Sequence, residues 1–357
     1  MPLVSIIIPV FNGERYLRSS LDSILNQTYA NIEVIVMDDA STDRTPEVVG
    51  AYGDRVRYYR QASNRGIYGN MNDGIDKSRG EFIAIYHADD IYHPTIVEHE
   101  VQFLDSYPAA GAVFCQDIFI DPDGHETGRL RIPLEARGSR PLDYRVVINC
   151  LLTYKNHLFV CPTCMVRASV YHDVGVYRDG EFRNTSDLEM YLRIARKYPV
   201  GVLEDYLLRY RHGHGSSAQR YHHLRTDPER YFRIMDLYLR EGGYELASPE
   251  AIRAYEAHRC QDQLMRAVNN YILGKRDESR ALLREVRVGR LLGTRRIQRW
   301  RMLALFGLLG IVARLPRISV VAALFYRRWH DKSKGPSGSR RLNSTPRVSQ
   351  TDSGSWI

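Results

Sequence analysis

The chain has 357 residues, of which 44% are hydrophobic and 26% charged, as in a soluble globular protein with one large domain or two ordinary ones. Its net charge of +8 comes from the C-terminal part: 16 basic and three acidic residues follow from Arg284 onward, which leaves 34 basic and 39 acidic residues before it. Five cysteines, an odd number in so long a chain, argue against a disulfide framework and favour reduced thiols in a cytoplasmic protein.

The first 120 residues alternate between apolar runs and helical patterns. Val4 to Val10 is a continuous apolar run, which is typical of a strand covered on both faces and not of a signal peptide. Further strands are expected at 32–37, 56–59, 81–86 and 112–114, with helices at 14–26 and 94–107. This alternation with short connections predicts an α/β fold: a Rossmann-like, mostly parallel sheet with helices on both faces.

Polar clusters follow three of the predicted strands. They are the segment Pro9 to Asn12, the pair Asp38–Asp39, and the pair Asp89–Asp90 in "YHADDIY". Ligands of such sheets bind at the carboxyl ends of strands, so we expect these clusters to converge on one crevice. Two adjacent carboxylates repel each other, so the pair could be a turn, a helix cap or a site that holds a cation. Its convergence with the other clusters favours more than a simple turn.

The remainder of the chain is expected to be mainly helical. An amphipathic helix is predicted at 184–199, with Ser186 or Asp187 as its cap, and 228–288 is predicted to be mostly helical. Two apolar runs, 302–313 and 318–326, are each shorter than the ~20 residues that span a bilayer. They fit either an interfacial segment on an anionic membrane or a pair of helices packed on the body. From Lys332 onward the composition predicts disorder.

Three segments together resemble family 2 glycosyltransferases with the GT-A fold. They are "VSIIIPVFNGERYLRSSLDSILNQTYANIEVIVMDDASTD", "NRGIYGNMNDGIDKSRGEFIAIYHADD" and "TSDLEMYLRIA", in this order and within residues 3–215. The resemblance implies an inverting transfer of a sugar from a nucleoside diphosphate sugar, with UDP as the default nucleotide, to an acceptor hydroxyl. It also implies a GT-A-type domain at 1–220. Beyond this domain, the residue patterns predict a helical region at 221–300, an apolar and basic segment at 301–330 and a disordered tail at 331–357.

The resemblance assigns roles to individual residues. Asp39 would accept a hydrogen bond from the nucleotide base, Asp90 would bind Mg²⁺ or Mn²⁺, and Asp187 would be the general base. The residues expected to contact the nucleotide sugar are Pro9, Phe11, Asn12, Asp39, Asn72 and Asp89. A hard cation prefers carboxylate oxygens, and it would neutralise the charge that grows on the leaving diphosphate. We expect Asp90 to touch this cation and not the protein core.

The chain departs from the family pattern at two places. His87 stands where many relatives have an acid, and Met71 stands where they often have an arginine. Each assigned acid also has a simpler interpretation: Asp39 as a loop residue, Asp187 as a helix cap, and the Asp89–Asp90 pair as a solvated turn. Phe11 is equally compatible with packing in the pocket wall.

The expected partners are a nucleoside diphosphate sugar, a glycan or lipid-linked glycan acceptor in cell-surface polysaccharide or glycolipid synthesis, and an anionic membrane surface on its cytoplasmic face. Nucleic acid is not expected, because no interleaved basic and aromatic pattern occurs. The alternatives are a nucleotidyltransferase, which would need a glycine-rich basic loop after the first strand, and a membrane-bound scaffold with an inactive body. A dinucleotide oxidoreductase is disfavoured because no G-x-G-x-x-G follows the first strand.

Overall fold

The structure is a computed structural model that describes residues 1–178, 180, 182, 185–213, 224–291 and 296–312. The chain divides into two compact units. The first consists of Met1–His223 and Glu229–Glu256, and the second of Leu224–Pro228 and Ala257–Ile357. Part of the predicted helical region, 229–256, is therefore built into the first unit.

The first unit is organised around one sheet, in the strand order β3-β2-β1-β4-β8-β6-β9-β5, with β7 paired to β6. The four strands at one side, β3, β2, β1 and β4, are parallel, as are β6 and β9, and the remaining pairs are antiparallel. The predicted mostly parallel sheet with a helical C-terminal region is thus confirmed, within a sheet that also contains antiparallel pairs. The strands are β1 (Val4–Val10), β2 (Ile32–Asp38), β3 (Arg57–Arg60), β4 (Phe82–Ile85), β5 (Ile91–Tyr92), β6 (Ala112–Ile120), β7 (Glu126–Arg129), β8 (Cys164–Arg167) and β9 (Val200–Arg211).

Helices cover both faces of this sheet, as the continuous apolar run of β1 predicts. Ile6 and Ile8 join a core cluster with Leu17 and Leu21, whereas Ile7 joins a separate cluster on the other face. The first cluster is covered by α1 (Leu17–Leu25), α2 (Thr45–Gly50) and α4 (Ile96–Ser106). The second is covered by α3 (Gly66–Lys77), α5 (Tyr144–Tyr154), α6 (Ala168–Val174), α7 (Ser186–Ala195) and α9 (Arg230–Tyr238). Short 3₁₀ turns occupy Gly53–Arg55, Leu134–Ala136 and Cys161–Thr163.

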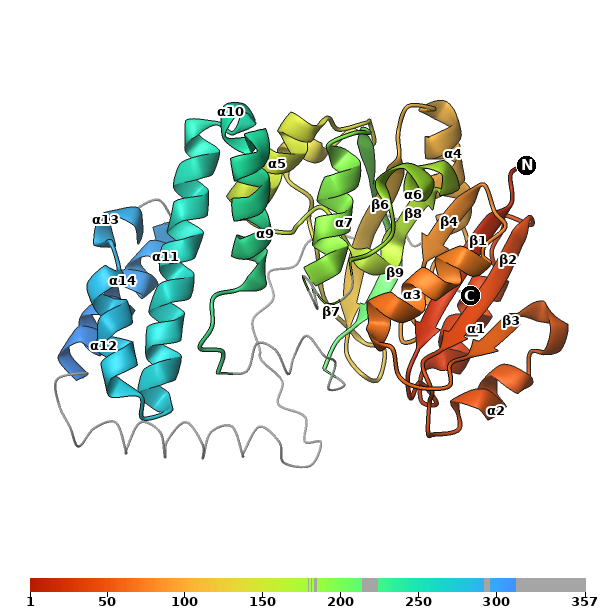
Figure 1. The fold of residues 1–357 in the computed structure, drawn as a ribbon, viewed down its shortest axis with the longest axis horizontal. Helices are drawn as coiled ribbons and strands as arrows, with labels where there is room; N and C mark the ends of the chain where they lie inside the picture. The colour runs from red at the N-terminus through yellow and green to blue at the C-terminus, as the bar shows by residue number, and fades with distance from the viewer. Residues whose placement is uncertain (179, 181, 183–184, 214–223, 292–295, 313–357) are drawn as a thin grey trace, which may run out of the picture. The chain divides into compact units, whose positions relative to one another are not determined.

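Helix α3 lies against β1 and β2 (Figure 1). The close approach depends on Gly74, because a Cβ atom there would lie only 2.5 Å from Cγ2 of Ile7. From inside the helix, the Asn70 side-chain amide donates a hydrogen bond of 2.6 Å to the carbonyl of Met37 in β2. This packing fixes the start of α3 beside the carboxyl end of β2.

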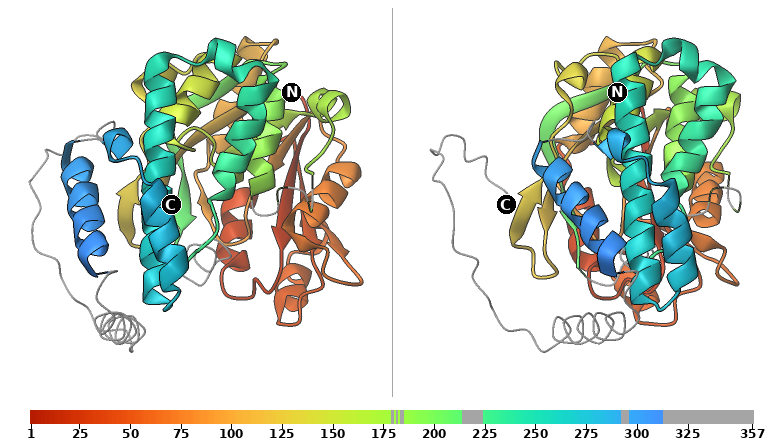
Figure 2. Two further views of the ribbon diagram at one scale, coloured as in Figure 1. Left: turned by 60° about the vertical axis from the view of Figure 1, so that its left-hand side comes forward. Right: turned by 90° about the vertical axis from the view of Figure 1, so that its left-hand side faces the viewer.

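The chain continues from α9 through a π turn (Leu239–Gly243) and α10 (Tyr244–Leu246) into the long helix α11 (Pro249–Ile272). The beginning of α11 lies alongside α9 (Figure 2), where the hydroxyl of Tyr255 donates to the carbonyl of Phe232 at 3.2 Å. Residues up to Glu256 belong to the first unit. The predicted helical character of 228–288 corresponds to these helices and to α12 (Arg276–Glu285).

The second unit contains the rest of α11, α12, α13 (Val288–Leu291) and α14 (Arg296–Val312). Its core gathers Leu264, Ala267 and Tyr271 of α11 with Leu309 of α14. The first apolar run therefore lies in α14 as far as Val312 and packs into this core up to Leu309, and the second run lies outside the described residues. No helix in the described part of the chain is long and apolar enough to cross a membrane. All five cysteines are free thiols.

Candidate active site

The three predicted polar clusters lie at one edge of the sheet, because β1, β2 and β4 are parallel and in register. Val10 pairs with Asp38, and Ile7 pairs with Ile85. The backbone amide of Asp39 donates to the carbonyl of Val10 at 2.8 Å, and that of Tyr86 donates to the carbonyl of Ile7 at 3.0 Å. The carboxyl ends of the three strands thus form a common platform.

The loop after β1 is tied to the loop after β2. Asn12 has a left-handed backbone with φ 53°, which is uncommon for a residue other than glycine. Its amide donates to Oγ of Ser41 at 2.9 Å, and its Oδ1 accepts the amide of Thr42 at 2.8 Å. The neighbouring ring of Phe11 is 51% exposed, whereas Pro9 is buried inside β1. Phe11 is therefore available for stacking, while Asn12 holds the two loops together.

The two acids after β2 have different surroundings. Asp38 is fully buried and accepts the amide of Ser41 at 2.8 Å and the hydroxyl of Tyr58 at 2.5 Å, so it holds the loop. Asp39 accepts the backbone amides of Arg65 at 2.6 Å and Gly66 at 3.0 Å, at the start of α3. A carboxylate at a helix N-terminus is favoured by the helix dipole, and each of its oxygens has a second lone pair for a ligand.

Burial of Asp39 sets the direction of its pKa shift. Burial raises the pKa of this carboxyl, although the amides of Arg65 and Gly66 act in the opposite direction. Both oxygens already accept protein amides, so any ligand that binds Asp39 would share this carboxylate with the start of α3.

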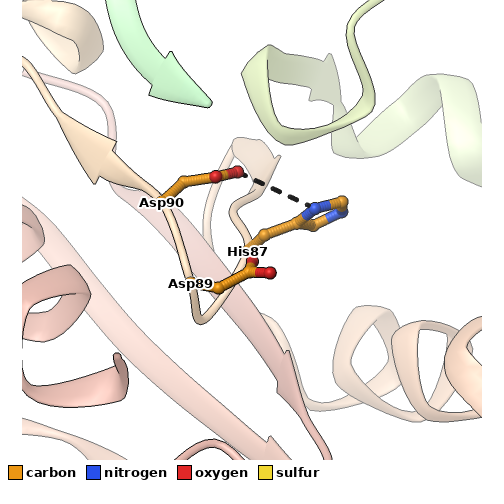
Figure 3. Close-up of side chains that lie close together, drawn as sticks. All are labelled: His87, Asp89 and Asp90. Carbon is orange, nitrogen blue, oxygen red and sulfur yellow. Dashed lines mark ion pairs between the residues drawn. The ribbon is translucent and has the colours of Figure 1, made fainter. Parts of the chain in front are cut away.

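The loop after β4 brings together His87, Asp89 and Asp90, with one ligand atom of each within 4.8 Å of the others (Figure 3). Oδ1 of Asp90 accepts the amide of Arg211 at 2.8 Å, and Oδ2 lies 3.9 Å from Nδ1 of His87. Oδ2 is buried and has no hydrogen-bond partner among the described residues. Burial and the charge of Asp89 raise the pKa of Asp90 well above its usual value. A divalent cation would compensate the negative charge of the Asp89 and Asp90 carboxylates, and carboxylate oxygens are the ligands that Mg²⁺ and similar ions prefer. The pair therefore fits a divalent cation.

Asp90 is more deeply embedded than the sequence suggested. Its side chain is 0% exposed, and it accepts a hydrogen bond from the end of β9. The expectation that Asp90 does not touch the core is therefore wrong, because this carboxylate also links the loop after β4 to the end of β9. Its contact with a cation stays a prediction. Asp89 is partly exposed and is the more accessible member of the pair.

Arg211, which sequence reasoning missed, clamps this loop. Its Nε donates to the carbonyl of Asp89 at 2.9 Å, and its Nη1 donates to the carbonyls of Asp121 and Pro122 at 3.1 and 3.0 Å. Its guanidinium lies 4.5 Å from the ring centre of Tyr16. Arg211 is 5% exposed, so these contacts form in a largely dehydrated site. The strand-final position of Arg211 in the segment "YLLRYR" was the one local signal.

Asp187 lies in the first turn of α7, and the N-cap position belongs to Thr185. Oδ1 of Asp187 accepts a hydrogen bond of 3.2 Å from the hydroxyl of Tyr68 in α3. Burial raises the pKa of Asp187, against the opposing effects of the Leu188 amide and the Tyr68 hydroxyl. Helix α3 thus meets Asp39 at its start and Asp187 through Tyr68.

Two further polar residues complete the surroundings. The Asn72 side chain donates to the carbonyl of Tyr177 at 2.8 Å and accepts its amide at 3.0 Å, so it holds the segment before α7. Its contact with a nucleotide sugar stays a prediction. Asp117 in β6 is buried, and burial raises its pKa to about 7. Its charge contributes to the raised pKa of Asp90.

Comparison of the sequence with known proteins places part of the chain in a family of sugar-transferring enzymes. Residues 5–175 match the family described as glycosyl transferase family 2. An uncharacterized glycosyltransferase of Rickettsia typhi is 31% identical over 211 residues, which are 59% of this chain and 64% of that protein. One from Rickettsia felis is 32% identical over 213 residues, 59% of this chain and 34% of that protein. The matched region spans less than two thirds of the length of these relatives.

Solved structures show the same fold. Staphylococcus aureus TarS 1–349 in complex with UDP-GlcNAc gives a TM-score of 0.58 at 16% identity and covers 92% of both chains. The mannosyltransferase PcManGT from Pyrobaculum calidifontis, in complex with GDP-Man and Mn²⁺, gives a TM-score of 0.51 at 18% identity, over 92% of this chain and 88% of that one.

Proposed function

This chain belongs to glycosyl transferase family 2 through its residues 5–175, and from this premise we propose that it is an inverting, metal-dependent glycosyltransferase. It moves a sugar from a nucleoside diphosphate sugar, with UDP as the first nucleotide to test, to an acceptor hydroxyl. The observation that carries the proposal is the buried, unpartnered Oδ2 of Asp90 beside Asp89 at the end of β4, within the part of the chain that the structure describes.

The nucleotide lies at the ends of β1 and β2. The exposed ring of Phe11 offers a stacking surface, and Asp39 accepts a hydrogen bond from the base with its remaining lone pairs. Pro9 and Asn12 shape the wall of the same pocket. The hydrogen bonds of Asn12 to Ser41 and Thr42 hold the loops after β1 and β2 together. TarS with UDP-GlcNAc and PcManGT with GDP-Man support this assignment, because both complexes hold a nucleotide sugar on the same fold.

Asp90, together with Asp89, holds the divalent cation, Mg²⁺ or Mn²⁺. When bound, the cation supplies positive charge that stabilises the diphosphate as its bond to the sugar breaks. The residues of the chain prepare this site in advance: Arg211 fixes the carbonyl of Asp89 and the Oδ1 of Asp90, which leaves Oδ2 of Asp90 directed toward the site. The presence of Mn²⁺ in the PcManGT complex supports the assignment.

Asp187 is the general base. Its carboxylate takes the proton of the acceptor hydroxyl as that oxygen bonds to the anomeric carbon, while the bond from this carbon to the diphosphate oxygen breaks. A single displacement of this kind inverts the anomeric configuration. Positioned bases contribute ~10²–10⁴-fold to such steps. Tyr68 is a positioning residue, because its hydroxyl orients Asp187 and stabilises its charged form.

The acceptor is a hydroxyl of a glycan or lipid-linked glycan, in cell-surface polysaccharide or glycolipid synthesis. The 16 basic residues from Arg284 onward support a peripheral position on the anionic cytoplasmic face of a membrane. Sedimentation of the full chain with anionic vesicles at low salt tests this location, and protein that stays in the supernatant refutes it.

A panel of UDP-, dTDP- and GDP-linked sugars tests the donor assignment. Thermal unfolding of the full chain is followed with each compound, with Mn²⁺, Mg²⁺ or a chelator. A ligand at ~100 times its Kd stabilises the folded state by ~2.7 kcal/mol, so a true donor raises Tm clearly and more with metal than with chelator. If no nucleotide sugar raises Tm under any of these conditions, the proposed function is wrong.

A further inference from the structure

The third member of the cluster after β4, His87, has no role in the function proposed so far. Its Nδ1 lies 3.9 Å from Oδ2 of Asp90, and the cluster of His87, Asp89 and Asp90 lies within 4.8 Å (Figure 3). Ligand atoms of one cation with bonds of roughly 2.1 Å are about 3 Å apart when adjacent and about 4.2 Å apart when opposite. The 3.9 Å between Nδ1 of His87 and Oδ2 of Asp90 lies between these two values, so both atoms are placed to bind one ion.

Hydrogen bonds hold the backbone of His87 in place, whereas the Nε2 atom of its ring has none among the described residues. Its carbonyl accepts the hydroxyl of Ser20 at 2.8 Å, and its amide donates to the hydroxyl of Tyr92 at 2.5 Å. Nε2 of the ring is buried without a hydrogen-bond partner among the described residues, as is Oδ2 of Asp90. The Oδ2 of Asp90 that faces Nδ1 of His87 is therefore buried without a hydrogen-bond partner in the described part of the chain, which indicates that a ligand completes the site between them.

We propose that His87 is a direct ligand of the divalent cation and that it makes the site select Mn²⁺ or Co²⁺ over Mg²⁺. This inference rests on the proposed function, because it concerns the same cation. Carboxylates and water suit Mg²⁺, whereas an imidazole nitrogen suits transition ions and increases their advantage along the series from Mn²⁺ to Co²⁺. A set of one imidazole and two carboxylates therefore favours a transition ion more than carboxylates alone.

The alternative is that His87 contacts a hydroxyl of the bound donor and leaves the cation to the acids. The two arrangements differ in one measurable respect. A ligand at the cation changes the ratio of affinities for Mn²⁺ and Mg²⁺, whereas a contact with the donor changes donor affinity equally with both ions.

The test is a direct measurement of metal binding that does not depend on turnover. The full chain is titrated with Mn²⁺, and free Mn²⁺ is counted by electron paramagnetic resonance, first without and then with UDP; Mg²⁺ is then added as competitor. His87→Asp and His87→Gln are compared with the wild type, and thermal unfolding verifies that each variant is folded. We expect the preference for Mn²⁺ over Mg²⁺ to fall at least ~10-fold in both variants, because even partners that only orient a ligand are worth ~10–100-fold in metal affinity.

His99 provides a matched control. Its Nδ1 also lies 3.9 Å from a carboxylate oxygen, that of Asp205, but both side chains are exposed. His99→Asp should leave the metal preference unchanged. An unchanged Mn²⁺ to Mg²⁺ ratio in both His87 variants overturns the inference and leaves the proposed function standing. Wild-type protein that binds no Mn²⁺, with or without UDP, overturns the inference and the metal dependence of the proposed function together.

Discussion

Replacement of Tyr68 by Phe removes one hydroxyl and leaves the ring in place, so it isolates the contact with Asp187. The hydroxyl lies 3.2 Å from Oδ1 of Asp187, and burial raises the pKa of Tyr68 well above its usual value, so the hydroxyl remains the donor. Hydrogen bonds to charged groups contribute ~1.5–3 kcal/mol, and 3.2 Å is longer than the optimum of ~2.7–2.8 Å, which favours the lower end. A loss of ~1.5 kcal/mol raises the pKa of Asp187 by about one unit.

The pH dependence of transfer gives the readout. Asp187 acts as a base only when it is deprotonated, so the acid limb of the kcat/KM profile should move up by about one pH unit in Tyr68→Phe. At low pH, where Asp187 is mostly protonated in both proteins, Tyr68→Phe should be ~10-fold slower than the wild type. At higher pH, where Asp187 is deprotonated in both, most of this difference should disappear. Tyr177→Phe is the control, because Tyr177 stacks on Tyr68 at 5.6 Å and its hydroxyl faces Tyr191. A profile for Tyr68→Phe with its acid limb in the wild-type position would refute the positioning role.

Three further substitutions test the remaining parts of the site. Asp39→Asn should weaken nucleotide binding at least ~10-fold in calorimetry while the metal requirement persists; unchanged affinity would return Asp39 to a loop role. Arg211→Lys removes the forked contacts to the carbonyls of Asp89, Asp121 and Pro122 and should lower Mn²⁺ affinity ~10–100-fold. Arg167→Lys, which loses similar contacts to Ala110 and Leu104, should reduce stability alone, and equal metal affinity in the two variants would contradict the clamp. Burial raises the pKa of Asp117 to about 7 in the folded state, whereas the unfolded chain releases this proton near pH 4. The free energy of unfolding should therefore fall as the pH rises from 4 to 7. Asp117→Asn should remove this dependence, at most about 4 kcal/mol in urea unfolding, and an identical pH slope in the variant would disprove it.

The first half of the fold was predictable because its signals are local. Strands β1, β2 and β4 are largely apolar runs that end at polar residues, and the intervening helices have regular apolar spacing. Strands β8 and β9 were not predicted. β8 pairs antiparallel with β4 and β6, and β9 pairs in parallel with β6 and antiparallel with β5. These partners are far apart in the sequence, and no short-range pattern specifies them.

The candidate site was predictable in its positions and less so in its contacts. The topological rule for strand ends indicated Asp39, Asp89 and Asp90 without any knowledge of distances. The burial of Asp90 and the clamp by Arg211 depend on β9, which is brought in by tertiary structure alone. Asp117 carried a usable signal, a charged residue inside the apolar segment "FCQDIFI", that the sequence interpretation did not use.

The most direct test of glycosyl transfer at this site compares donor binding and turnover in Asp187→Asn. The nucleotide sugar that stabilises the wild type best is incubated with Mn²⁺, and release of the nucleoside diphosphate is measured beside the calorimetric Kd. We predict that the wild type releases the nucleoside diphosphate, that a chelator abolishes the release, and that Asp187→Asn binds the donor normally but turns it over at least ~10²-fold more slowly. Asn keeps an acceptor oxygen for the hydroxyl of Tyr68, so a purely structural role of this side chain predicts full activity. Turnover near the wild-type rate in this variant would contradict the account.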